Sequence, residues 1–88
     1  MRISGLEYII EYVDPSELGG SIATADFDNQ RIKISFDATA QTQCIAKLHE
    51  TIHILDKVYG IELEERQVVL LAHALIALKA DNPHADII

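Results

Sequence analysis

Two histidines and a glutamate stand close together in the segment "KLHETIHILDKVYG", residues 47–60. His49 and His53 are four residues apart, and on an α-helix this spacing places both imidazoles on one face. Two such nitrogens can reach one Zn²⁺ ion at the ~2.0–2.1 Å that zinc requires. Glu50 does not ligate in this arrangement, but it can take a proton from a zinc-bound water and pass it to a leaving amine. The pattern H-E-x-x-H therefore predicts His49 and His53 as metal ligands and Glu50 as a general base.

A third ligand must come from another element, because a catalytic zinc ion usually has three protein ligands and one open position. His73 lies in the apolar segment "LLAHALIAL", where core packing explains a histidine about as well as metal binding does. The carboxylate candidates are Glu62, Glu64 and Glu65, although acidic residues are common at the start of a helix. We place His73 slightly ahead of Glu65 as the third ligand and keep Glu65 as the alternative.

Two helices are expected to position these side chains. The first follows an N-cap at Asp37 or Thr39, carries apolar residues at spacings of three and four, and ends at Gly60. The second begins near Glu64 and ends at the Asp-Asn-Pro of residues 81–83. The segment between them is short, so we expect the two helices to be antiparallel neighbours.

The first third of the chain is expected to be extended. Three segments are rich in β-branched and aromatic residues or alternate between polar and apolar residues: 6–13, 21–27 and 31–36. The second and third of these are separated by a turn at 28–30 and should form a hairpin. The sequence therefore predicts an α+β fold for residues 1–88 as a single domain. About three short antiparallel strands precede two antiparallel helices.

Composition narrows the classes of partner. The net charge of −7 and only seven basic residues, scattered along the chain, disfavour nucleic acid. No secretory leader is visible, and no apolar run approaches the ~18 residues that span a bilayer, so we expect a cytoplasmic protein without a membrane partner. A chain of 88 residues buries only roughly 60% of its unfolded surface, so a bound metal or a homodimer would help to stabilise it.

The chain resembles the small zincin-like metallopeptidases of the ImmA/IrrE group, many of them encoded by phages and other mobile elements. The resemblance rests on three segments: "TADFDNQRIKIS", "LHETIHILDKVYG" and "LEERQVVLLAHALIALKADNP". It implies a Zn²⁺ ion held by His49 and His53, with Glu50 as general base. It also implies that the strand of Ile32, Lys33 and Ile34 forms a sheet edge, which could align an extended peptide by strand addition.

One position departs from the pattern of this group. In its better-known members a glutamate on the second helix completes the metal site, and Val69 stands at the matching position here. Glu65 lies one turn before it and His73 one turn after it, so either could substitute. Two functions remain. One is a zinc-dependent metallopeptidase that acts on a protein or peptide, such as a transcriptional regulator. The other is an inactive zincin-like binding or regulatory module, with a homodimer as one option.

Overall fold

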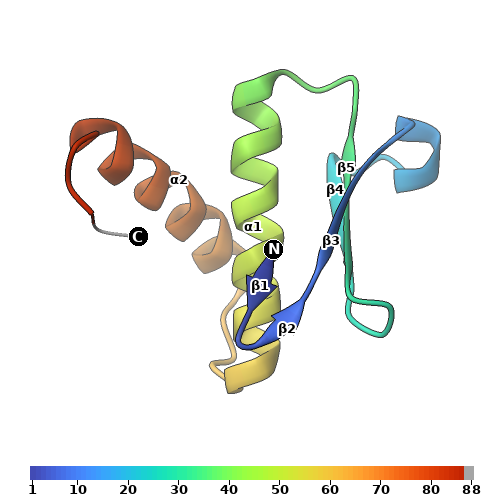
Figure 1. Cartoon of the computed structure of the whole chain (residues 1–88), viewed down its shortest axis with the longest axis horizontal. Coiled ribbons are helices and arrows are strands. Elements are labelled where there is room, and N and C mark those ends of the chain that lie inside the picture. The colour runs from blue at the N-terminus through green and yellow to red at the C-terminus, as the bar shows by residue number, and fades with distance from the viewer. Residues whose placement is uncertain (87–88) are drawn as a thin grey trace.

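The computed structural model describes residues 1–86 and has an α+β fold, as the sequence predicts (Figure 1). The last two residues of the expected domain 1–88 lie outside the described part. The elements are β1 (Arg2–Ile3), β2 (Leu6–Glu7), β3 (Ile9–Val13), the 3₁₀-helix η1 (Pro15–Leu18), β4 (Ala23–Asp26), β5 (Arg31–Ser35), α1 (Ala40–Tyr59) and α2 (Glu65–Asp81). All five strands therefore precede the two α-helices along the described chain.

The larger sheet has three strands in the order β3-β5-β4. Strands β4 and β5 pair antiparallel and confirm the predicted hairpin. Strand β3 pairs with the other side of β5 in parallel, with Ile9 opposite Arg31, although three antiparallel strands were expected. The predicted strand 6–13 is divided, because β2 pairs with β1 in a separate small ribbon. Local alternation in the sequence indicates a strand but does not select its partner or direction.

Strand β5 lies in the centre of this sheet, which corrects the expectation that Ile32, Lys33 and Ile34 form an edge. The side chains of Ile32 and Ile34 are fully buried, and both long sides of β5 are paired with neighbouring strands. Alternation with a period of two shows that one face of a strand is covered, and it looks the same in a central strand and in an edge strand. The open edge nearer to α1 belongs to β4.

Helix α1 packs against the sheet and builds the main core. It begins after Thr39, whose side chain accepts the backbone N–H of Thr42, and it ends at Gly60, which has a φ of 63°. Both boundaries agree with the sequence prediction. The buried residues of the main core are Ile3, Tyr8, Ala23, Ile32, Ile34 and Ile54. Because Ile54 is fully buried among residues of the sheet, it holds the C-terminal half of α1 in place.

Helix α2 is attached to α1 by a second, smaller cluster. Its N-terminus has a capping box between Glu64 and Gln67, and its buried residues Val68 and Ala72 pack against Ile52 of α1. Beyond this contact α2 leads away from α1, rather than lying beside it as the expected antiparallel pair (Figure 1). Neither of the two helices in residues 1–86 combines the length and apolar character needed to cross a membrane.

Candidate metal centre

Helix α1 presents the two predicted histidine ligands together. The Nε2 atoms of His49 and His53 are 3.1 Å apart, and the ring centroids are separated by 4.8 Å. Both side chains are partly buried on the side of α1 where α2 begins. Because residues four apart on a helix are neighbours, the sequence spacing accounts for this approach without any distortion of the helix.

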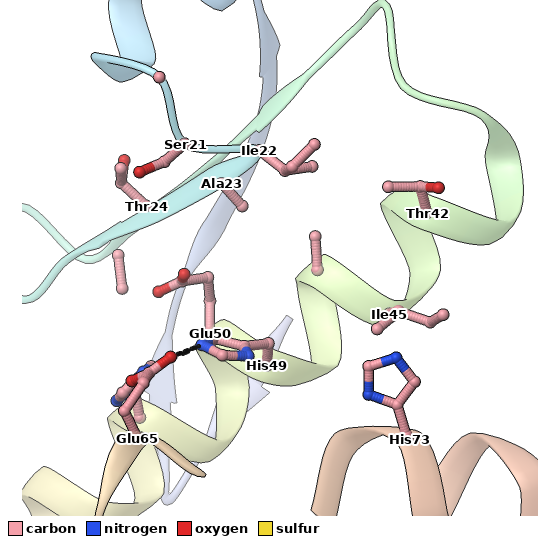
Figure 2. A pocket seen from close by; sticks show the side chains of 14 residues that line it. Ser21, Ile22, Ala23, Thr24, Thr42, Ile45, His49, Glu50, Glu65 and His73 are labelled. Carbon is pink, nitrogen blue, oxygen red and sulfur yellow. Dashed lines mark hydrogen bonds and ion pairs between the residues drawn. The ribbon is translucent and has the colours of Figure 1, made fainter. Parts of the chain in front are cut away.

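The third group is Glu65, the first residue of α2. One carboxylate oxygen lies 2.8 Å from Nε2 of His49, and the other lies 2.9 Å from Nε2 of His53 (Figure 2). The connection between the helices is held by Asp56, whose Oδ1 accepts the backbone N–H of Leu63. This turn places Glu65 at the histidine face of α1, and no local spacing in the sequence indicates it.

These three groups suit a metal ion such as Zn²⁺. They are the one cluster of potential metal ligands within residues 1–86, and their donor atoms lie within 4.8 Å of one another. Ligand atoms around a tetrahedral zinc ion are roughly 3.3 Å apart when the bonds are 2.0–2.1 Å long. The observed separations are 2.8 and 2.9 Å from the two oxygens of Glu65 to the histidines and 3.1 Å between the histidines, which is shorter than that value and within hydrogen-bond range. Two histidines and a glutamate are also a known ligand set of catalytic zinc sites.

His73 lies apart from this cluster. It is eight residues after Glu65, which corresponds to about 12 Å along the helix axis. Its Nδ1 is 2.9 Å from the backbone oxygen of Val69, and the ring faces the far end of the same cleft (Figure 2). The preference for His73 over Glu65 is therefore reversed. Glu65 can supply the glutamate that was expected at the position of Val69, because α2 contacts α1 through the first turns of α2 and then diverges from it.

Glu50 lies beside the three candidate ligands. Its half-buried carboxyl group points from α1 toward β4, next to Glu65 (Figure 2). Burial raises the pKa of Glu50, the nearby charge of His53 lowers this pKa, and the charge of Glu65 raises it. The net shift is upward from the ordinary value of 4.5. A carboxylate with a raised pKa holds a transferred proton more firmly, which is the property that a general base requires.

A cleft of about 780 Å³ lies between α1 and the region around β4. The three candidate ligands and Glu50 line one end, and His73 lines the other together with Thr42 and Ile45 (Figure 2). Residues 20–25 form the opposite wall, and β4 has no strand on its outer side within the part of the chain that the structure describes. The outer strand of the sheet that borders the cleft is thus Ala23–Asp26, a position that the sequence did not indicate.

Comparison of the chain with protein-family models, with curated proteins and with solved structures found no match.

Proposed function

We propose that this chain is a zinc-dependent metallopeptidase that hydrolyses a peptide bond in a protein or peptide. The observation that supports this most directly is the convergence of His49, His53 and Glu65, with Glu50 alongside them. Zinc bound by the three ligating groups would lower the pKa of a coordinated water and polarise the scissile carbonyl. Proton transfer and alignment of the substrate would fall to side chains and backbone groups of the chain itself.

In this proposal Glu50 moves the protons. It takes one proton from the attacking water and delivers it to the nitrogen of the leaving amine. Its partial burial excludes bulk water from the carboxylate and raises its pKa, so the proton is retained until the amine accepts it. Its position between Glu65 and β4 places it at the end of the cleft where the ligating groups lie (Figure 2).

The substrate would lie along β4 as an added strand. The residues proposed for this role are Ala23–Asp26, in place of the buried central strand that contains Ile32 and Ile34. The resemblance to the ImmA/IrrE group favours a transcriptional regulator as the substrate and the cytoplasm as the compartment. The net charge of −7 favours a protein substrate over nucleic acid.

A binding or regulatory module without hydrolysis is the second candidate. It is favoured by the position of Glu65, whose side chain is 63% exposed and stands on the more weakly attached helix. A metal site completed by such a residue binds less tightly than a site whose ligands are all held in the core. The open edge of β4 could then bind a peptide without cleaving it.

Metal content and cleavage can be measured on the same protein samples. The wild type and the Glu50→Gln and Glu65→Ala variants are stripped with a chelator, dialysed against zinc and analysed for bound metal. They are then incubated with a proteome-derived peptide library, whose cleavage is followed by mass spectrometry. We expect one zinc ion per chain in the wild type and in Glu50→Gln, a strong reduction in Glu65→Ala, and cleavage by the wild type alone.

Two outcomes would contradict the proposed peptidase. A wild-type chain that takes up no zinc lacks the metal site, and cleavage that persists in Glu50→Gln does not use the proposed base. Stoichiometric zinc binding without Glu50-dependent cleavage would instead support the binding module. Circular dichroism of each variant provides the control for folding.

A further inference from the structure

The outer side of α2 carries an apolar stripe that nothing in residues 1–86 covers. Val68 and Ala72 face α1, and within residues 1–86 no other element covers the side of α2 that is turned away from them (Figure 1). Its residues are all exposed and are spaced by three, one, three, three and one: Gln67, Leu70, Leu71, Ala74, Ala77 and Leu78. We call this set the outer stripe. It contains no charged side chain and repeats the spacing of a helix-packing seam.

The outer stripe is hollowed at one end. Leu63 and the first four residues of the stripe line a shallow groove of about 350 Å³. Leu70 is 56% exposed and Leu71 41%, so the walls of this groove are open to solvent. At the other end, Leu78 is 40% exposed. The stripe therefore has a shallow groove at its start and an exposed leucine at its end, with the small Ala74 between them.

This arrangement is complementary to itself when one copy is reversed. We propose that the outer stripe packs against the outer stripe of a second copy of this chain, with the two α2 helices antiparallel and crossing at Ala74. Leu78 of one subunit then lies opposite Leu70 of the other and enters its groove. The same contact repeats across the two-fold axis, which is the requirement for a closed dimer.

The charges at the two ends of α2 favour the antiparallel direction. Arg66 lies eight residues before Ala74, and Asp81 lies seven residues after it. Both are exposed, and neither forms an ion pair within residues 1–86. Antiparallel helices place each Arg66 beside Asp81 of the partner subunit, whereas parallel helices would bring like charges together. An anionic membrane surface is a poorer occupant, because the stripe lacks flanking Lys and Arg residues and the chain carries a net charge of −7.

The proposed dimer leaves the metal centre accessible. Glu65 and His73 line the cleft, and none of the six stripe residues is among the residues that line it. The inference therefore goes beyond the proposed peptidase and does not depend on it. A pair of short helices gives an interface at the low end of the usual size range, so we expect dissociation in roughly the micromolar range.

Sedimentation velocity over a series of protein concentrations tests the dimer, both in a chelator and with zinc, because the chelator removes any metal-bridged association. We expect the wild type to be dimeric at high concentration in both conditions. Ala74→Glu places two glutamates against each other at the crossing point and should weaken the dimer by about tenfold or more. Val58→Glu is the matched control, because it introduces the same charge at a side chain of α1 that is 44% exposed.

Exchange of the end charges tests the direction. Arg66→Asp and Asp81→Arg should each weaken the dimer, and the double variant should recover it. Each change places a charge at the helix end that the helix dipole favours, so neither should impair folding. A chain that is folded by circular dichroism but monomeric at every concentration would overturn the proposal. A dimer that Ala74→Glu leaves intact, or a double variant no better than the single ones, would overturn it as well.

Discussion

The two helices differ in how firmly they are held. Helix α1 is covered by the sheet on one side, through Ile54, and by α2 on another side, through Ile52. Within residues 1–86, helix α2 is attached to α1 by the small cluster around Val68 and Ala72 and by the contacts of Glu65 with His49 and His53, and its outer side is exposed. Two of the candidate metal ligands thus stand on the firmly packed helix, and the third stands at the start of the weakly packed one.

If the proposed metal site forms, this difference would couple the attachment of α2 to metal binding. An interaction that anchors α2 would hold Glu65 near His49 and His53, and a metal ion held by these groups would anchor α2 in return. The coupling separates two classes of substitution. Changes in the main core should unfold the whole domain, whereas changes in the smaller cluster should also act on metal affinity.

The largest effect on stability is expected from Ile54→Ala. This side chain is fully buried in the main core, and its truncation removes apolar contacts and leaves a cavity. We expect a loss of about 2–5 kcal/mol in the free energy of unfolding, measured by urea denaturation followed by circular dichroism. Both helices should unfold in one transition. A loss below about 1 kcal/mol would show that Ile54 does not hold α1 firmly against the sheet.

Glu65→Ala should have the largest effect on the metal. Removal of a direct ligand should lower zinc affinity by at least about 100-fold, since loss of a merely supporting group costs 10–100-fold. Competition with a chromophoric chelator measures this affinity. His73→Ala is the matched comparison, because His73 lines the same cleft but lies apart from the cluster. The zinc affinity of this variant should stay within about threefold of the wild type. The opposite order would restore His73 as the ligand.

A smaller effect on stability is expected from Val68→Ala. Val68 is fully buried in the cluster that attaches α2, and two methyl groups are lost at about 0.8 kcal/mol each. The free energy of unfolding should therefore fall by about 1–2 kcal/mol, and zinc affinity should fall as well because Glu65 is less well positioned. Val58→Ala, at an exposed position of α1, should change stability by less than about 0.5 kcal/mol. Unchanged zinc affinity in Val68→Ala would break the proposed coupling.

The smallest effect is expected from Glu50→Gln in metal-free protein. Burial raises the pKa of Glu50 in the folded state, so the folded state binds this proton more tightly than the unfolded state does. Ionised Glu50 therefore opposes folding at neutral pH, and this cost disappears as the pH falls below the ordinary value of 4.5. The variant should melt at a higher temperature than the wild type at pH 7, and the two should converge near pH 4. A lower melting temperature at pH 7 would contradict this assignment.

Much of the local structure could be predicted because its causes are local. The cap at Thr39, the stop at Gly60 and the hairpin of β4 and β5 each depend on a few adjacent residues. The parallel pairing of β3 with β5 could not be predicted in this way, because it joins segments about twenty residues apart. The same limit applies to the sheet edge, since Ile32 and Ile34 alternate in the same manner whether β5 has one neighbour or two.

The sequence by itself determined that His49, Glu50 and His53 share one helix, with the histidines on a common face, because the pitch of an α-helix relates residues four apart. Only the tertiary structure decided that Glu65 rather than His73 joins them. That choice depends on where α2 meets α1 and how soon it diverges, which the turn at Asp56 and the packing of Val68 and Ala72 control. Contacts between helices are set by packing over the whole molecule, and no local spacing records them.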